Sequence, residues 1–426
     1  MKKTLLLSVV ASTMIMAGGD IAPVEPVVEV VEVSPWNFTG ESVAYMQTRD
    51  LAGRGDLFGG DETAGGLGLQ LGVTNADIFA GIGFGAKVAA IGSGNDNGFS
   101  NSNFCMQTGY GLTEGYLTYG MDSISTSLKV GRQTLPKSLS PFAFSEGWQM
   151  FKNTFDAALL VNTSLPNTAL VYAFVNKSNG SVNNLPTAAG WKNGYEDIGS
   201  FYHINPSKDG VNMLTVQNKS IENLSLTGTW YYAANYTEAL ANGGDVNILW
   251  GDATYAADAF TVGIQGGQVD PDGLSSTSAF GAKIAGNLGM FSLLAAYSSV
   301  DDGAVPIVNL GTDVKTPLYT QSILDQDTIS LDADTFKLAA GMKALGGKFG
   351  LAYMNADLGN GSRGAVMYSG ADRVNASGTY EEIDFTYKTK VGENTTLFAG
   401  YVFQSDDRYN DEDQNFVRFW ARYNFN

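Results

Sequence analysis

The C-terminal end of the chain constrains its fold most strongly. From Val417 to Phe425 apolar residues alternate with a second set that carries Arg418 and Arg422. Successive side chains of a strand point to opposite faces, so this segment predicts a strand with one apolar and one charged face. In a soluble sheet the apolar face covers a core, whereas in a membrane barrel it faces lipid and the arginines line a watery lumen. The aromatic residue next to the terminus, Phe425, favours the barrel, and a soluble edge strand is the alternative.

The N-terminus also favours a barrel. Two lysines, an apolar stretch from Thr4 to Met16 and the small residues Ala17-Gly18-Gly19 predict a cleaved signal peptide over residues 1–19. That stretch is too short for a membrane helix. We therefore expect export to the outer membrane of a bacterium with two membranes. Residues 20–35 are rich in Val, Glu and Pro, which predicts a periplasmic lead-in segment, and the barrel domain is expected over residues 36–426.

Composition excludes several other classes of protein. A single cysteine, Cys105, rules out an internal disulfide framework. No stretch after the signal reaches the roughly 18 uninterrupted apolar residues of a membrane helix. The mean hydropathy of -0.05 is ordinary for a barrel that is apolar on one face only. The formal charge of -18 is incompatible with a nucleic-acid footprint and favours cations.

Runs with a period of two recur along the rest of the chain and predict eighteen strands, with sixteen as the alternative count. The runs centre on residues 38–47, 64–73, 78–91, 106–119, 125–133, 155–162, 169–175, 211–217, 224–233, 246–255, 260–268, 278–285, 290–298, 335–344, 348–355, 379–389, 395–404 and 415–425. Short turns, such as Asn75-Ala76-Asp77, alternate with long loops over residues 49–62, 92–103, 134–154, 176–210, 299–333 and 358–378. Tight periplasmic turns and long external loops are typical of membrane barrels, so we predict an all-β transmembrane antiparallel β-barrel.

The stretch between Leu112 and Val175 is more specific. It contains Leu112-Thr113-Glu114-Gly115-Tyr116-Leu117-Thr118-Tyr119, Lys129-Val130-Gly131-Arg132-Gln133 and Asn153-Thr154-Phe155-Asp156-Ala157. This text resembles the OprD-type outer-membrane porin family, especially the major porins of Campylobacter-like epsilonproteobacteria. The resemblance implies an eighteen-strand barrel whose third external loop, here residues 134–154, folds inward and narrows the pore. OprD-type channels are often monomers and general porins are commonly trimers, so a homotrimer stays open.

Fixed charges held across a narrow gap orient a passing solute and sort it by sign. Within the inward loop, Glu146 lies where the family tends to have aspartate, and Gln149 replaces an arginine, which puts anion selectivity in doubt. Arg132 has the opposite parity to Lys129, so it faces the lumen only if a bulge or the start of the loop turns it. The full set of candidate pore-lining residues is Lys129, Arg132, Lys137, Glu146, Gln149, Lys152, Lys337, Lys343, Asp384, Lys388, Arg418 and Arg422.

The residues that enzymes and cofactor sites need are missing from the sequence pattern. The sole histidine, His203, lies in the loop 176–210, and no Cys/His metal spacing or phosphate-binding glycine loop is evident. The acidic pairs Asp301-Asp302 and Asp406-Asp407 and the run Asp411-Glu412-Asp413 offer oxygen ligands for Ca²⁺, but none has EF-hand spacing. We therefore expect no catalytic activity and no cofactor. The acidic clusters are interpreted mainly as charged loop residues in contact with water, with a Ca²⁺ site as the alternative.

The sequence thus predicts a water-filled channel for passive diffusion of ions and small hydrophilic solutes. Acidic loops at its mouth and basic residues on its wall predict weak cation selectivity. The expected partners are outer-membrane lipid, lipopolysaccharide and the solutes themselves. The alternative function is a surface structural or adhesive barrel that contacts host or neighbouring cells through its long loops, 176–210 and 299–333.

Overall fold

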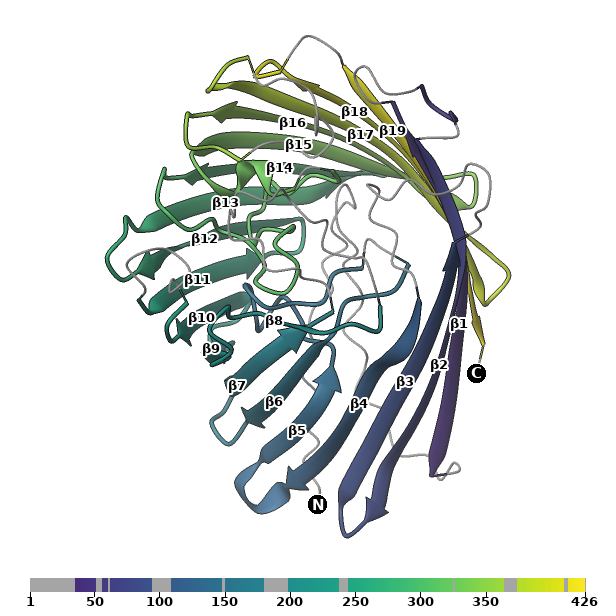
Figure 1. Cartoon of the computed structure of the whole chain (residues 1–426), viewed down its shortest axis with the longest axis vertical. Helices are drawn as coiled ribbons and strands as arrows, with labels where there is room; N and C mark the ends of the chain where they lie inside the picture. The colour runs from purple at the N-terminus through teal and green to yellow at the C-terminus, as the bar shows by residue number, and fades with distance from the viewer. Residues whose placement is uncertain are drawn as a thin grey trace.

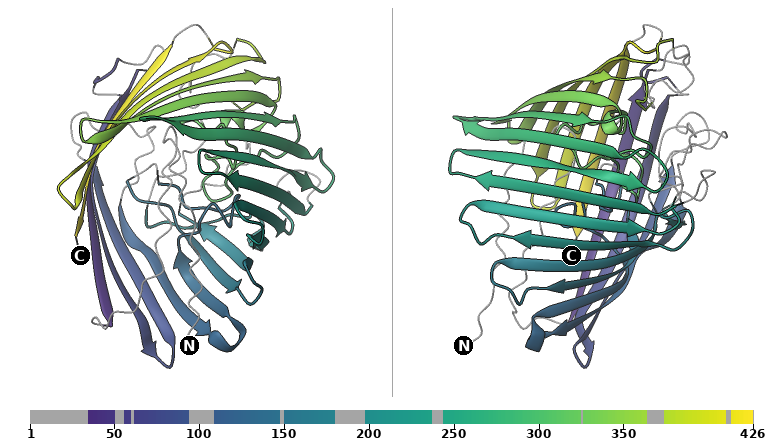
Figure 2. Two further views of the ribbon diagram at one scale, coloured as in Figure 1. Left: turned by 180° about the vertical axis from the view of Figure 1, so that it is seen from behind. Right: turned by 90° about the vertical axis from the view of Figure 1, so that its left-hand side faces the viewer.

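A computed structural model describes residues 35–50, 56–59, 62–93, 109–147, 150–179, 198–236, 244–324, 326–363, 374–409 and 413–425. The predicted signal peptide and almost all of the lead-in segment lie outside these ranges. The described residues form a closed antiparallel β-barrel of 18 strands (Figure 1), and Figure 2 shows its strands from two further sides. No helix in the described ranges is long and apolar enough to cross a membrane.

The strands follow one another around the barrel in chain order. They are β1 (Trp36–Arg49), β2 (Thr63–Phe79), β3 (Ile82–Ser93), β4 (Gly109–Met121), β5 (Thr126–Gln133), β6 (Phe155–Asn162), β7 (Thr168–Ser178), β9 (Val211–Asn218), β10 (Leu224–Ala233), β11 (Val246–Ala256), β12 (Phe260–Pro271), β13 (Thr277–Leu288), β14 (Phe291–Val300), β15 (Ala333–Ala344), β16 (Gly347–Leu358), β17 (Gly378–Val391), β18 (Thr395–Asp406) and β19 (Gln414–Phe425). A short strand, β8 (Tyr202–His203), pairs with the end of β7. Two 3₁₀ turns, η1 (Asp122–Ile124) and η2 (Thr328–Ser330), complete the elements.

The C-terminal strand closes the barrel. β19 pairs with β1 from Gly40 opposite Phe425 to Arg49 opposite Phe416, so neither strand is left as a free edge. Along β19, Arg418 and Trp420 are buried on the inner face, whereas Phe419 is 44% exposed on the outer face. Exposed Leu, Ile, Val, Phe and Tyr side chains recur in this way on strands all around the barrel. The polarity is thus the inverse of a soluble protein, with apolar residues outside and polar residues inside.

One predicted turn is wrong. The turn expected at residues 75–77 lies inside β2, which continues to Phe79, and the chain reverses at Ala80-Gly81. Asn75 Oδ1 accepts the amide of Asp77 at 3.0 Å, and Asp77 Oδ1 accepts the amide of Gly81 at 3.0 Å. Asn and Asp side chains that bond to nearby backbone amides are common in turns, and this is why the Asn-Ala-Asp segment looks like one. The reversal itself needs the positive φ of Gly81, which is +82°.

Two long connections enter the barrel. Residues 134–154 between β5 and β6, and residues 301–332 between β14 and β15, cross its interior as irregular segments (Figure 1). In the second segment Ile307, Asn309 and Ile329 are fully buried. The interpretation of residues 299–333 as a loop available for contacts outside the cell is therefore wrong. Its apolar residues and several of its polar side chains pack against the barrel wall and against the first loop.

Candidate channel constriction

The loop of residues 134–154, called here the first inward loop, is anchored on two distant parts of the wall. The ring of Phe142 is fully buried and packs edge-on against Tyr231 of β10 and Trp250 of β11, with ring centroids 5.8 Å and 5.4 Å apart. The hydroxyl of Tyr231 also accepts the amide of Phe142 at 3.0 Å. Near the other end of the loop, Phe151 packs against Gly68 of β2, where an added Cβ would lie 2.9 Å from the ring. Because β2 and β10 are far apart around the barrel, the loop spans the lumen.

Residues 301–332, the second inward loop, are joined to the first by Glu146. This carboxylate is 3% exposed, and its Oε1 accepts hydrogen bonds from Asn309 Nδ2 at 2.7 Å and from the Thr312 hydroxyl. The amide of Lys315 approaches the same oxygen at 3.4 Å. Hydrogen bonds to an ionised acceptor are stronger than neutral ones. The interpretation of Glu146 as a charge that faces the pore is therefore wrong, because its acceptor capacity is used to hold the two loops together.

Main-chain contacts extend this seam between the two loops. Asn309 donates through Nδ2 to the carbonyl of Phe144 at 2.8 Å and accepts the amide of Phe144 at 3.2 Å. The amide of Leu310 donates to the carbonyl of Phe142 at 2.8 Å. At the far end, Lys137 Nζ donates to the carbonyl of Thr316 at 2.9 Å. Sequence reasoning missed Asn309, since a lone asparagine in a long polar loop gives no signal of a partner on another loop.

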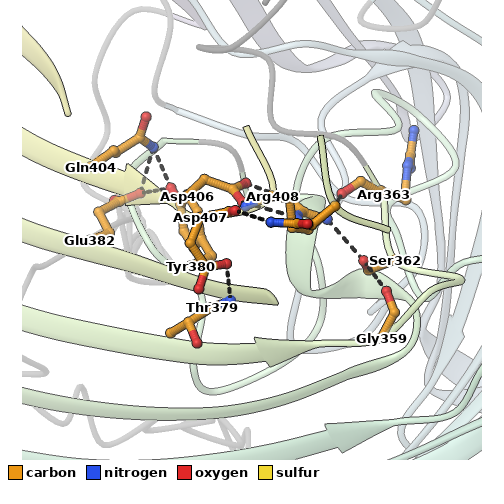
Figure 3. A network of polar contacts seen from close by, with 11 residues as sticks. Gly359, Ser362, Arg363, Thr379, Tyr380, Glu382, Gln404, Asp406, Asp407 and Arg408 are labelled. Atoms are coloured by element: carbon orange, nitrogen blue, oxygen red, sulfur yellow. Dashed lines mark hydrogen bonds and ion pairs between the residues drawn. The ribbon is translucent and has the colours of Figure 1, made fainter. Parts of the chain in front are cut away.

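The second inward loop is fixed in turn to the wall at β17. Glu382, which is 1% exposed, accepts the amides of Ile323 and Leu324 at 2.7 and 3.0 Å. Tyr380 and Gln404 donate to the other carboxylate oxygen of Glu382 at 2.6 and 3.0 Å (Figure 3). The two loops therefore form a continuous crossbar from β10 and β11 through the Glu146 seam to β17.

An ionic cluster also holds the second inward loop through Asp313 and Asp327. Arg363 forms two hydrogen bonds with Asp313, at 3.1 and 3.0 Å, and an ion pair with Asp327 at 3.4 Å. Arg408, which is fully buried, pairs with Asp406 and donates to the carbonyl of Arg363 at 2.7 Å (Figure 3). Burial raises the pKa of Asp327 to about 6, and the nearby charge of Asp313 adds to this rise while Arg363 opposes it. Burial raises the pKa of Asp313 as well, against the effect of Arg363.

A group of polar residues remains beside the crossbar on the wall of β11 and β13. The ammonium of Lys283 lies 3.9 Å from the centre of the Tyr319 ring, and the Tyr319 hydroxyl donates to Asp252. Enclosure between the loops and the like charges of Lys315 and Lys283 lower the pKa of Lys137. These effects bring the pKa of Lys137 to about 7, so its charge depends on pH near neutrality. Sequence reasoning missed Asp252, Lys283 and Tyr319, although the parity of the first two along their strands was available.

The predicted pore-lining residues on the strands divide into two groups. Lys337 and Asp384 are each 2% exposed beneath the second inward loop. Lys337 donates to the carbonyl of Gln321, whereas Asp384 Oδ1 lacks a hydrogen-bond partner among the described residues. The others lie on the inner wall away from the loops. The Lys129 ammonium lies 3.7 Å from the centre of the Tyr116 ring. The charged groups of Lys388 and Arg422 lie 5.5 and 4.8 Å from the centre of the Trp420 ring. Arg418 donates a hydrogen bond to Gln47 at 2.5 Å, and Lys343 is exposed.

The remaining candidates do not join the crossbar. Arg132 pairs with Asp156 at 2.8 Å, and its guanidinium lies 3.3 Å over the ring of Phe201. The adjacent Gln133 is fully buried and faces inward, so Arg132 keeps the outward parity, and its assignment as a pore-lining residue is wrong. Lys152 is half-buried, and Gln149 lies outside the described residues. Within the described ranges, no three His, Cys, Asp or Glu side chains are grouped so as to hold a metal ion.

Solved structures resemble this chain, whereas comparisons of its sequence with protein families and curated proteins find no significant match. Among solved structures, OccK3 (OpdO) of Pseudomonas aeruginosa superimposes with a TM-score of 0.66 and 15% identity over 92% of this chain and 95% of that one. OccD3 (OpdP) of the same organism gives 0.65 and 13% over 92% of both chains, and OpdQ gives 0.65 and 16% over 92% and 99%. The chain has an OprD-type porin fold. At these identities the similarity concerns the fold, and residue roles rest on the geometry described above.

Proposed function

We propose that the protein is a non-enzymatic outer-membrane porin that admits ions and small hydrophilic solutes by passive diffusion. One observation carries this proposal, namely a closed barrel with apolar residues outside, polar residues inside, and a crossbar of two joined loops within the lumen. The apolar belt fits lipid, and the crossbar narrows a passage instead of closing it with a folded plug domain. The similarity to OprD-type barrels supports the same conclusion. Residues 1–19 would direct export as a cleaved signal peptide.

Planar bilayer recording of the purified protein tests this function. We expect discrete, long-lived conductance steps that scale with salt concentration. A silent membrane, with insertion verified by a heat-modifiability gel, would overturn the proposal.

We further propose a weak preference for cations. The chain carries 43 acidic against 25 Lys and Arg residues, and carboxylates at the outer rim, such as Asp301 and Asp302, would concentrate cations at the mouth. Lys137 and Lys283 beside the crossbar oppose this effect, so the preference should be small and should fade as salt screens the rim. Reversal potentials in a KCl gradient measure it. Anion preference that persists at high salt would mean that the lysines, and not the acidic rim, control the pore.

The alternative function, a barrel that adheres to cells through its long loops, loses one of the two loops on which it rested. It needed two long loops outside the barrel, and most of the described residues between 303 and 332 are packed inside it. The central part of the other loop, residues 180–197, lies outside the described residues.

A further inference from the structure

A row of polar residues lies across the loop ends of β5, β6, β7 and β8. Arg132 is opposite Asp156, Asp156 is opposite Lys177, and Lys177 is opposite His203. Residues directly opposite each other on neighbouring strands have Cβ atoms about 5 Å apart, so the four side chains form one continuous surface. Lys208 is exposed in the turn that follows β8, where its amide donates to the carbonyl of Asn205 at 2.9 Å.

This row faces the outside of the barrel. On each strand the neighbouring residue toward the loop, Gln133, Phe155 or Ser178, is fully buried on the inner face. Alternation then places Arg132, Asp156 and Lys177 on the outer face, and each of them is partly exposed. The position next to the external loops puts the row at the level of the headgroups of the outer leaflet if the barrel spans that membrane.

The net charge of the row is positive. Arg132 is held by Asp156 at 2.8 and 3.2 Å and by the carbonyl of Leu112 at 2.7 Å, so this ion pair is internally compensated. Lys177 and Lys208 form no ion pair with any residue that the structure describes. Partial burial, Lys177 and Lys208 lower the pKa of His203, whose Nδ1 lies 2.9 Å from Asn176 Oδ1. The exposed Asp209 beside Lys208 is the acidic residue nearest to that lysine along the chain.

The opposite side of the rim carries the opposite charge. Outward-facing residues at the loop ends of β12, β15, β16 and β17 are Asp270, Asp334, Asp357 and Glu381. Asp334 and Asp357 are directly opposite each other on adjacent strands, a pairing that like charges normally disfavour. An anionic headgroup would be repelled from this acidic arc and attracted to the row on β5–β8.

We propose that the row formed by Arg132, Asp156, Lys177 and His203, together with Lys208, binds a phosphate group of lipopolysaccharide in the outer leaflet. The inference rests on the proposed outer-membrane location. Lysine ammonium groups bind phosphate as point charges, and the compensated Arg132–Asp156 pair forms a fixed, neutral edge beside them. The exposed ring of Tyr110 lies at the loop end of β4, the strand next to β5, and aromatic residues there favour the interface between headgroups and hydrocarbon.

Titration of the full-length protein in detergent with deep-rough lipopolysaccharide tests the proposal. Loss of one lysine near an anionic lipid surface should weaken binding about five-fold, so the double variant Lys177→Gln/Lys208→Gln should lose about 25-fold. Lipopolysaccharide stripped of its lipid A phosphates should bind the wild-type protein as weakly as the intact lipid binds the double variant. Lys219→Gln, at the turn between β9 and β10 on the other end of the barrel, is the matched control and should bind normally.

A second readout uses the only histidine. In protein labelled at histidine, the pKa of His203 followed by NMR should rise when lipopolysaccharide is added to the wild type, and it should not move in the double variant. Unchanged affinity in the double variant, equal loss in Lys219→Gln, or equal binding of the dephosphorylated lipid would each overturn the proposal. Full displacement by inorganic phosphate at equimolar concentration would assign the site to free phosphate, and crosslinking of the row to the acidic arc of a second copy would assign it to an oligomer interface. Bilayer conductance of the same preparations separates this result from the proposed channel function.

Discussion

Replacing Glu146 should release the two inward loops from each other. Its Oε1 accepts hydrogen bonds from Asn309 and Thr312 and lies 3.4 Å from the amide of Lys315, all of them buried. A buried hydrogen bond to a charged acceptor contributes about 1.5–3 kcal/mol, and the three are not additive, so we expect Glu146→Ala to weaken the seam by about 3 kcal/mol. That loss corresponds to about a 100-fold increase in the population with the loops apart. Glu146→Gln retains an acceptor oxygen and should lose about half as much free energy.

Single-channel recording measures this effect. Glu146→Ala should show frequent transitions to states of different conductance, Glu146→Gln should be intermediate, and the wild type should be quiet. Glu222→Ala, in an exposed turn next to β10, removes the same charge without touching the seam and is the control. If Glu146→Ala records as quietly as the wild type at equal conductance, the seam does not hold the crossbar and the reasoning fails.

Other variants test other parts of the crossbar. The pKa of Asp327 is raised from 3.8 to about 6 in the folded state, so folding favours its protonated form. The melting temperature should therefore rise as the pH falls from about 6 to about 4, and Asp327→Asn should reduce this pH dependence in thermal scans. Phe142→Ala empties a fully buried site between two aromatic rings and should cost about 3–5 kcal/mol locally, seen as faster proteolysis of the first inward loop. Lys137→Gln should shift the reversal potential toward cations at low salt, and an unchanged potential would exclude Lys137 from the conduction path.

The strands could be predicted from sequence because their signal is local. Alternation along a segment such as 417–425 depends on neighbouring residues alone, and the register of β19 on β1 and the buried Arg418 agree with it. The one misplaced turn, at residues 75–77, arose because Asn75 and Asp77 make turn-like bonds inside a strand that continues to Phe79.

The crossbar could be predicted only in part. The resemblance of the stretch around β5 and β6 led to the first inward loop, but the second inward loop has the polar composition of an external loop. Asn309 is 163 residues from Glu146, and no periodicity connects two residues so far apart in irregular segments. The charge of Glu146 was visible in the sequence, whereas its three donors depend on how the two loops meet in space.

Excision of the second inward loop tests the central claim most directly. The amide of Ile307 donates to the carbonyl of Ser330 at 2.9 Å, so residues 308–329 can be replaced by a short glycine linker with little strain on β14 and β15. The account predicts that wild-type protein in planar bilayers gives discrete steps and that the excised variant gives steps several-fold larger. Equal conductance in the two proteins would show that the crossbar does not narrow the channel, and the absence of steps in both would contradict the assignment as a porin.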